Sequence, residues 1–196
     1  MTARMQNKVV LVTGAGSVGP GWGNGRAIAV RMVQEGAKVM ALDMEASRLE
    51  ETMHLGQQAQ AQAQHQGEIE AMTCHVTQTA SVQAAVEATL KRFGRIDVLV
   101  NNVGGSAAGG PVEMSEEVWD AQIDHNLKSV FLMCKHVLPH MLQQGAGNVV
   151  NMASTSGIRW TGSAQVAYAA TKAAVIQMGR VMAVQYAKQG IRVNTV

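Results

Sequence analysis

Short apolar runs rich in β-branched residues alternate along the chain with longer segments whose apolar positions recur at helical spacing. The short runs predict strands at Lys8–Thr13, Lys38–Asp43, Ile69–His75, Asp97–Asn101, Asn148–Met152 and from Arg192 onward. The longer segments predict helices around Arg26–Glu35, Glu45–Gln66, Ser81–Phe93, Glu116–Leu142 and Gln165–Gln189. This alternation predicts an α/β fold, in which helices flank a doubly wound, mostly parallel sheet to give three layers.

The composition is typical of one large globular domain. The chain has 196 residues, of which 47% are hydrophobic, so it can bury a substantial core and is not a disordered chain. The segment Gln57–Gln66 is nearly all Gln, Ala and His, and we interpret it as the solvated tail of the second helix. No repeat or linker-like stretch divides residues 1–196.

The net charge and the length of the longest apolar stretches argue against several classes of binding partner. A formal net charge of +2, spread without basic runs, gives no reason to expect nucleic-acid binding. No apolar stretch approaches the length of a membrane span, and the N-terminus leads directly into a strand, so a cytoplasmic protein that binds no membrane is expected. Cys74 and Cys134 show no metal-ligand spacing; we predict buried free thiols and no metal site.

A glycine-rich loop, Gly14 to Gly25, connects the first strand to the helix that starts near Arg26. Glycines permit a tight turn and let the backbone approach a pyrophosphate, whose charge then lies at a helix N-terminus. Asp43 ends the second strand, where a carboxylate can accept hydrogen bonds from the adenosine ribose and would repel a 2′-phosphate. The pattern favours NAD over NADP, although Asp43 could instead cap the helix near Glu45.

Tyr168 and Lys172 are four residues apart in a predicted helix, which places both side chains on one helix face. A neighbouring ammonium stabilises a phenolate, so Tyr168 could act as a general acid or base. A surface pair on a helix is the alternative interpretation of this spacing.

Taken together, these residues resemble the short-chain dehydrogenase/reductase family, in its compact single-domain branch, over almost the whole chain. The matching pieces are Thr13-Gly14 with Gly23 and Gly25, Asn101-Asn102-Val103-Gly104, Asn126, Ser154 in Asn-Met-Ala-Ser-Thr-Ser-Gly, Tyr168-Ala-Ala-Thr-Lys172, and Gly190-Ile-Arg-Val-Asn-Thr-Val. Each motif alone is weak evidence for the family, but the order and spacing of all of them together are specific to it.

The resemblance implies a Rossmann domain that transfers hydride between a nicotinamide and a carbonyl or alcohol carbon. Tyr168 would exchange the proton with the substrate oxygen, and Lys172 would assist Tyr168 and hold the nicotinamide ribose. Ser154 would orient the substrate oxygen, and Asn126 would keep a bend in its helix that seats a water in a proton relay. The cofactor-binding residues would be Gly14, Gly23, Asn24, Gly25, Asp43, His75, Val76, Asn102, Gly104, Tyr168 and Lys172.

The sequence departs from the family pattern at two places. About five residues, Val18–Trp22, are inserted in the glycine loop, so an alternative register uses Gly14, Gly19 and Gly21. Trp22 would either cover the pyrophosphate or pack on the surface. His75 stands where the family usually has an Asp that contacts adenine, and it is either an adenine contact or a structural histidine. Ser156 competes with Ser154 for its role.

The sequence therefore predicts a NAD-dependent oxidoreductase acting on a secondary alcohol or ketone. A non-catalytic NAD-binding regulatory protein and an enoyl-thioester reductase are the alternatives. We expect a homodimer or homotetramer, because the small residues of the last helix permit close helix approach. These residues are Ala169, Ala170, Ala173 and Ala174.

The substrate is not specified by this sequence, and the direction of the reaction stays open. Five residues are expected to reach the substrate, and they suggest a ligand of mixed polarity. They are Gly105, Ser106, Arg159, Trp160 and Gln165. The chain stops at Val196 within the last predicted strand, and we expect a single domain truncated before its substrate lid and last strand.

Overall fold

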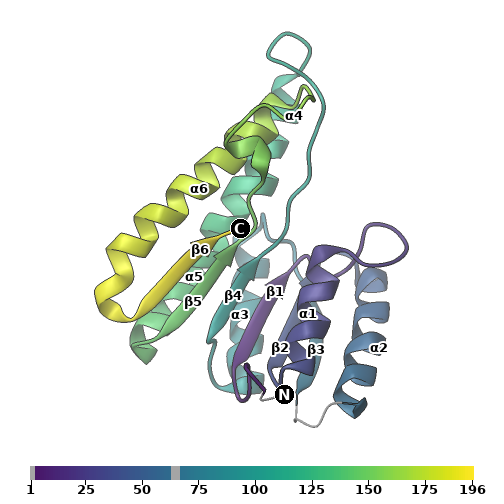
Figure 1. Ribbon diagram of the computed structural model, residues 1–196, viewed down its shortest axis with the longest axis vertical. Helices are drawn as coiled ribbons and strands as arrows, with labels where there is room; N and C mark the ends of the chain where they lie inside the picture. The colour runs from purple at the N-terminus through teal and green to yellow at the C-terminus, as the bar shows by residue number, and fades with distance from the viewer. Residues whose placement is uncertain (1–2, 63–66) are drawn as a thin grey trace.

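A computed structural model describes residues 3–62 and 67–196 and contains one parallel sheet of six strands in the order β3-β2-β1-β4-β5-β6 (Figure 1). The strands are β1 (Val9–Thr13), β2 (Lys38–Asp43), β3 (Glu68–Thr73), β4 (Val98–Asn101), β5 (Gly147–Asn151) and β6 (Ile191–Thr195). The α/β doubly wound sheet is thus confirmed. The strand order reverses between β1 and β4, and in such sheets a ligand cleft opens at the carboxyl ends of the strands at that point.

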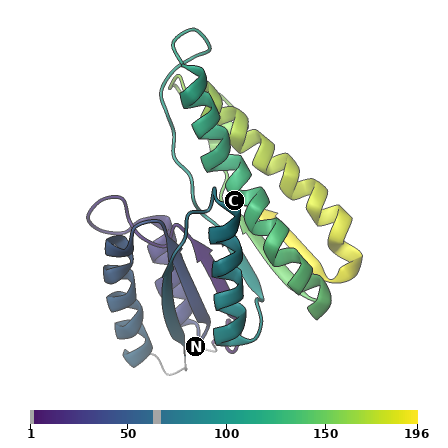
Figure 2. The same ribbon diagram turned by 180° about the vertical axis from the view of Figure 1, so that it is seen from behind.

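Helices cover both faces of the sheet, but not to the same extent (Figures 1 and 2). They are α1 (Asn24–Gln34), α2 (Ala46–Gln62), α3 (Thr79–Phe93), α4 (Glu116–Ile123), α5 (Ser129–Gln144) and α6 (Val166–Tyr186). On the face seen in Figure 1, α1 and α2 lie over the half of the sheet formed by β1 to β3, and none of the described helices covers β5 and β6. Helices α3, α5 and α6 lie against the opposite face, which Figure 2 shows.

Alternate residues of the central strands pack into two separate hydrophobic cores, one on each face of the sheet. Leu11, Leu99 and Val149 point toward α3, α5 and α6, whereas Val10 and Val100 pack with α1 and α2. All five residues of β1 are buried, as expected for a central parallel strand that is covered on both faces. Two full cores hold β1 rigidly, and the loop that follows it therefore starts from a fixed point.

The helix predicted over Glu116–Leu142 is present as one unbroken helical run, but it is not α-helical throughout. A π-helical segment, η1 (Asp124–Lys128), lies between α4 and α5. Hydrophobic periodicity does not reveal the one extra residue that a π-turn accommodates, so the sequence pattern stays helical throughout. The last predicted helix ends as α6 followed by a short 3₁₀ turn, η3 (Ala187–Gln189). Residues 63–66 of the predicted second helix lie outside the described residues.

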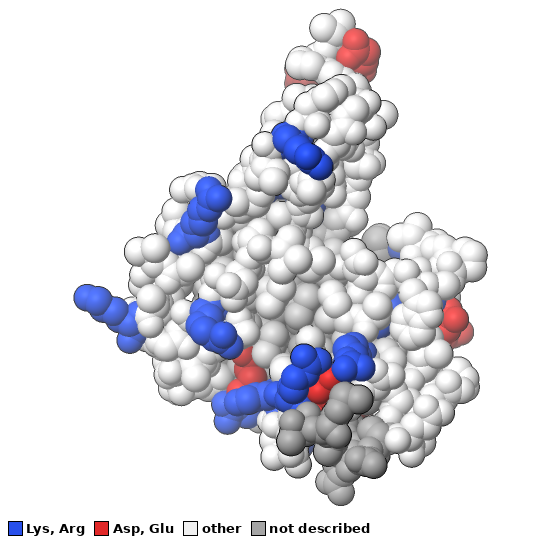
Figure 3. Space-filling model, in the orientation of Figure 1, with Lys and Arg blue, Asp and Glu red and all other residues white. Residues whose placement is uncertain are grey.

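Both cysteines are free and buried, as predicted. Burial raises the pKa of the Cys134 thiol to about 12, which leaves it protonated and unreactive. Among the helices that the structure describes, none is long and apolar enough to cross a membrane. On the face shown in Figure 3, most Lys and Arg side chains gather in the lower part of the view, with Asp and Glu among them.

Candidate functional site

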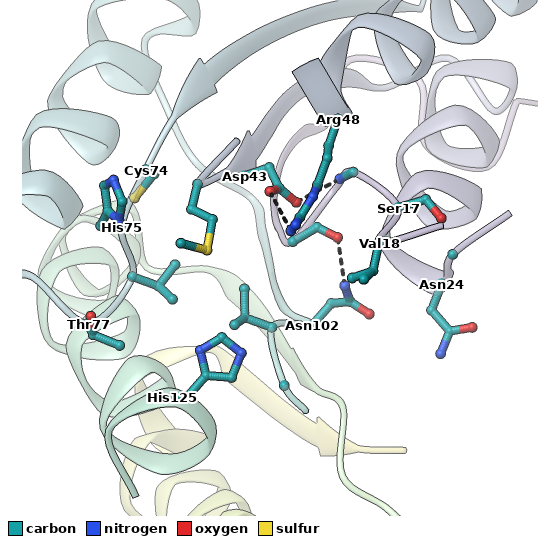
Figure 4. A pocket seen from close by; sticks show the side chains of 18 residues that line it. Ser17, Val18, Asn24, Asp43, Arg48, Cys74, His75, Thr77, Asn102 and His125 are labelled. Carbon is teal, nitrogen blue, oxygen red and sulfur yellow. Dashed lines mark hydrogen bonds and ion pairs between the residues drawn. The ribbon is translucent and has the colours of Figure 1, made fainter. Parts of the chain in front are cut away.

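A cleft of about 320 Å³ opens at the carboxyl ends of β1, β2, β3 and β4, within the size range of small-molecule and cofactor sites (Figure 4). Nine residues predicted to bind a cofactor line this cleft. They are Gly14, Gly23, Asn24, Gly25, Asp43, His75, Val76, Asn102 and Gly104. Tyr168, Lys172 and Ser154 do not line it, and they lie on α6 and beyond β5 instead.

Helix α1 begins immediately beyond the glycine loop, and its first turn closely approaches the end of β1. Gly14 has φ +61°, and a Cβ atom on Gly25 would overlap the carbonyl oxygen of Gly14. No atom lies within 4 Å of the position that a Cβ would take on Gly19 or Gly21. The geometry thus favours the register with Gly23 and Gly25, which directs the amino end of α1 at the cleft.

The inserted loop is anchored by a buried arginine. Arg26 is 3% exposed, and its guanidinium donates to the carbonyl oxygen of Gly21 at 2.5 Å and to the Thr52 hydroxyl at 3.1 Å. It also forms an ion pair with Glu51 at 2.5 Å. Thr52 in turn donates to the carbonyl oxygen of Ala15 at 2.9 Å. This network ties the insertion and the glycine turn to α2.

Trp22, in the same insertion, is 62% exposed and does not line the cleft. Val18 does line the cleft, although its side chain is almost fully exposed. Of the two alternatives for Trp22, the structure shows the surface position.

Asp43 lies at the base of the cleft and is buried. Its Oδ2 accepts a hydrogen bond from the Gly16 amide at 3.0 Å, and its Oδ1 accepts one from the Glu45 amide at 3.2 Å. A carboxylate oxygen can accept two hydrogen bonds, so each oxygen retains one free position. The bond to Glu45 is a local turn bond and not a helix cap, because α2 begins only at Ala46; Asp43 thus keeps free acceptor positions at the cleft.

Two strand ends complete the cleft wall. Asn102 donates through Nδ2 to the carbonyl oxygens of Thr13 at 3.1 Å and Gly14 at 2.9 Å, and so holds the glycine turn (Figure 4). His75 is exposed at the cleft, with its backbone amide bonded to the Ser81 hydroxyl at 2.9 Å. The His75 ring is therefore available to a ligand and is not part of the core.

A second group of predicted residues converges on Gly104. A Cβ atom on Gly104 would lie 2.9 Å from the Lys172 Nζ and 3.1 Å from the Asn126 Oδ1. The Lys172 ammonium is 5.6 Å from the centroid of the Tyr168 ring, and it donates to the carbonyl oxygen of Met152 at 2.7 Å. Burial lowers the pKa of Lys172. The structure thus brings Asn126, Tyr168 and Lys172 to the edge of the cleft.

Asn126 lies inside the π-helical segment η1 and is completely buried. Its side-chain amide bonds to both backbone polar groups of Gly105: Oδ1 accepts from the N–H at 2.9 Å and Nδ2 donates to the carbonyl oxygen at 3.0 Å. It also donates to Gln122 Oε1, which accepts from the Ala107 amide as well. The loop after β4 is thereby joined to the π-helical turn that contains Asn126.

The two competing serines have different surroundings. Ser154 Oγ accepts from the Ser156 amide at 3.1 Å, which leaves the Ser154 hydroxyl proton able to donate elsewhere. Ser156 Oγ instead bonds to Gln165 Nε2 at 2.9 Å and lies 3.2 Å from the Thr161 hydroxyl. The geometry favours Ser154 as a donor to a ligand. Arg159, Trp160 and Gln165 border a separate cavity beside Pro111, whereas Gly105 and Ser106 do not.

Sequence reasoning missed half of the cleft lining. The missed residues are Gly16, Ser17, Val18, Met44, Arg48, Cys74, Thr77, Val103 and His125. Gly16 and Val103 belong to recognised motifs, so their position could have been inferred. Arg48 and His125 carry no motif, and only the packing of α2 and η1 brings them to the cleft.

Known protein families and curated proteins match almost the whole chain. Residues 8–196 match the family model described as short chain dehydrogenase. The chain is 41% identical to the 2-(R)-hydroxypropyl-CoM dehydrogenase of Xanthobacter autotrophicus, covering 97% of this chain and 73% of the relative. It is 40% identical to the levodione reductase of Leifsonia aquatica, covering 100% and 70%.

Solved structures are similar over the same length. A short-chain dehydrogenase/reductase from Burkholderia xenovorans has a TM-score of 0.93 at 55% identity, covering 98% of this chain and 71% of that one. An NAD⁺-bound xylitol dehydrogenase has a TM-score of 0.87 at 31% identity, covering 98% and 70%. The actinorhodin polyketide ketoreductase with NADPH also has a TM-score of 0.87, at 34% identity, covering 99% and 70%.

The glycine register can be tested with a matched pair of variants. Gly25→Ala should abolish dinucleotide binding and destabilise the fold, because its Cβ would collide with the Gly14 carbonyl. Gly19→Ala adds the same atom in open space and should leave both properties unchanged. NADH binding followed by fluorescence, together with thermal unfolding, would check this. Equal losses in the two variants would contradict the register.

His125 should make stability depend on pH. Burial first, and the positive charge of Lys172 second, lower the pKa of His125. A histidine whose pKa is lower in the folded state contributes stability above its unfolded pKa of about 6.5 and loses it as the pH falls through the window below that value. Denaturant unfolding between about pH 7.5 and pH 5.5 should show a smaller pH dependence in His125→Gln than in the wild type. The exposed His54→Gln variant is the control, and an equal slope in His125→Gln would refute this role.

Proposed function

The chain belongs to the short-chain dehydrogenase family, and on that premise we propose that it transfers a hydride between NAD and the carbon of a secondary alcohol or ketone. The observation that carries this proposal is the buried Lys172 ammonium, 5.6 Å from the Tyr168 ring centroid and directly beside Gly104 of the cleft. A paired ammonium and phenol next to a dinucleotide cleft suits proton exchange with a substrate oxygen. A regulatory protein that only binds NAD would have no use for this pair.

The cleft residues fit an adenine dinucleotide. The contact between Gly14 and Gly25 lets the free N–H groups of the first turn of α1 face a pyrophosphate. Asp43 retains one acceptor position on each oxygen, which matches the two hydroxyls of a ribose. Its negative charge supports a preference for NAD over NADP. When bound, the nicotinamide supplies or accepts the hydride.

The proton is handled by residues of this chain. In oxidation the Tyr168 phenolate accepts the hydroxyl proton of the substrate, and in reduction the phenol returns it. The Lys172 ammonium stabilises the phenolate, and the free hydroxyl proton of Ser154 donates to the substrate oxygen. The π-turn at Asn126 frees backbone groups of η1 that can hold a water between Lys172 and solvent. NAD use favours the oxidative direction.

The substrate is a small alcohol or carbonyl compound of mixed polarity. The cavity beside Pro111 offers the Arg159 guanidinium, the Trp160 ring and the Gln165 amide. Such a lining accepts a ligand with both apolar and hydrogen-bonding groups. A cofactor-reduction screen over secondary alcohols, polyols, sugars and hydroxysteroids would identify the class.

We also infer a homodimer or homotetramer formed through α5 and α6. An apolar groove between these helices contains Phe131, Leu138 and Val181, and Phe131 and Val181 are about half exposed. Ala170 and Ala173 are exposed on α6, where small side chains let a second helix approach closely. An exposed apolar patch of this kind marks a protein interface.

Tyr168→Phe tests the mechanism. The variant lacks the hydroxyl that exchanges the proton, so turnover should fall by about 10²-fold or more while NADH affinity changes little. Steady-state kinetics and NADH titration would measure the two effects. Tyr186→Phe removes a hydroxyl at the far end of α6 and should behave like the wild type. Wild-type turnover by Tyr168→Phe would eliminate the proposed mechanism.

Val181→Asp tests the assembly. A carboxylate in the groove between α5 and α6 should dissociate the oligomer, because burying an unpaired charge is costly. Light scattering should give two or four times the mass of one chain for the wild type and one chain mass for the variant. Val112→Asp, at a loop residue that is 91% exposed, should keep the wild-type mass. A wild-type mass equal to that of one chain would rule out the assembly.

A further inference from the structure

The insertion in the glycine loop places one apolar side chain at the rim of the cleft. Val18 lines the cleft next to Ser17, yet its side chain is 90% exposed (Figure 4). None of the residues in Val18–Trp22 carries a charge. Covering an apolar side chain that is exposed to water is favourable. Val18 is thus a surface that a ligand filling the cleft would cover.

The position of Val18 along the cleft follows from Gly16, two residues earlier in the chain. The Gly16 amide donates to Asp43 Oδ2 at 3.0 Å, and a Cβ atom on Gly16 would lie 2.5 Å from the Arg48 Cβ. Two residues span at most about 7 Å. The insertion therefore borders the end of the cleft at Asp43, which we call the ribose end because Asp43 is the residue proposed to bind the adenosine ribose. Val18 consequently faces the half of a bound dinucleotide that contains adenosine.

The insertion is anchored at one end and free at its tip. Arg26 donates to the Gly21 carbonyl oxygen at 2.5 Å, and its ion pair with Glu51 holds the guanidinium in place. Gly19 is exposed, and no described atom lies within 4 Å of the position of a Cβ on it. Segments with few packed contacts rearrange at a low cost in free energy. Val18 can therefore settle on a ligand while Gly21 stays in place.

The other side chains of the loop do not share this position. Trp22 is 62% exposed and does not line the cleft. The Ser17 hydroxyl donates to the Gly19 carbonyl oxygen at 2.8 Å, so its proton is used within the loop. The apolar group that the insertion presents to the cleft is thus Val18.

From this arrangement we propose that Val18 covers the adenosine half of a bound dinucleotide, and that the insertion Val18–Trp22 slows the release of the ligand. The Val18 methyl groups pack on the ligand at the ribose end, while Arg26 keeps the base of the loop fixed at Gly21. This inference rests on the proposed dinucleotide-binding function and adds to it the residue that sets how long the ligand stays bound.

The dissociation of NADH, followed by stopped-flow fluorescence during displacement, tests this role. Val18→Ser should raise the dissociation rate constant about three- to tenfold, because the apolar contact is lost and variants of one binding site differ mainly in dissociation. Val18→Ile keeps an apolar contact and should release NADH no faster than the wild type. Val112→Ser is the matched control and should behave like the wild type, because Val112 is 91% exposed and does not line the cleft.

ADP-ribose, titrated by calorimetry, locates the contact on the ligand. ADP-ribose lacks the nicotinamide, so Val18→Ser should lower its affinity by about the same factor by which it speeds the release of NADH. This factor should change little with ionic strength, because the contact is apolar. Thermal unfolding of Val18→Ser should match the wild type, since the side chain is exposed.

Three results would overturn the role of Val18: an unchanged release of NADH in Val18→Ser, an equally fast release in Val18→Ile, or an effect that is seen with NADH and not with ADP-ribose. In each of these cases both ligands still bind, so the dinucleotide-binding function stands and this inference alone fails. If neither NADH nor ADP-ribose binds the wild type, the dinucleotide-binding function itself fails, and the role of Val18 fails with it.

Discussion

The end of β1 and the first turn of α1 touch at Gly14 and Gly25, where no side-chain carbon can be accommodated. This contact brings the amino end of α1 to the cleft, and Asn102 holds it in place through its bonds to Thr13 and Gly14. The insertion of Val18–Trp22 does not disturb it, because Arg26 ties the lengthened loop back to α2. The cofactor end of the site therefore depends on a backbone contact and on the buried cation that supports it.

The end of the cleft proposed to carry the chemistry depends on an irregular helix. Asn126 bonds to both the backbone N–H and the carbonyl of Gly105 from within the π-turn η1, and Gln122 accepts from the Ala107 amide one turn earlier. Gly104 is consequently held against Lys172, whose ammonium lies close to the Tyr168 ring. The π-turn and the bonds from Asn126 to Gly105 thus occur at the same place in the chain.

Electrostatics separates the two ends of the cleft. At the ribose end Asp43 and Arg48 offer opposite charges, whereas at the other end Lys172 is a buried cation whose pKa burial lowers. His125 lines the cleft, and its pKa is lowered by burial and by Lys172. The cleft thus has paired opposite charges at one end and a buried cation near the other, joined by the glycine-lined floor.

The positions of the strands and helices, the glycine register and the pair Tyr168 and Lys172 could be predicted from the sequence, because apolar periodicity and fixed spacings are local properties. The π-turn could not be predicted, since it is stabilised by bonds between Asn126 and a loop more than twenty positions earlier in the sequence. Arg26, Arg48 and His125 carry no motif, and their roles arise from the packing of α1, α2 and η1 around the ends of the strands. Local sequence determined which elements form and where the chemistry-bearing residues stand along them. Tertiary structure alone decided which charges meet, because ion pairs and hydrogen bonds between distant segments depend on how those elements pack.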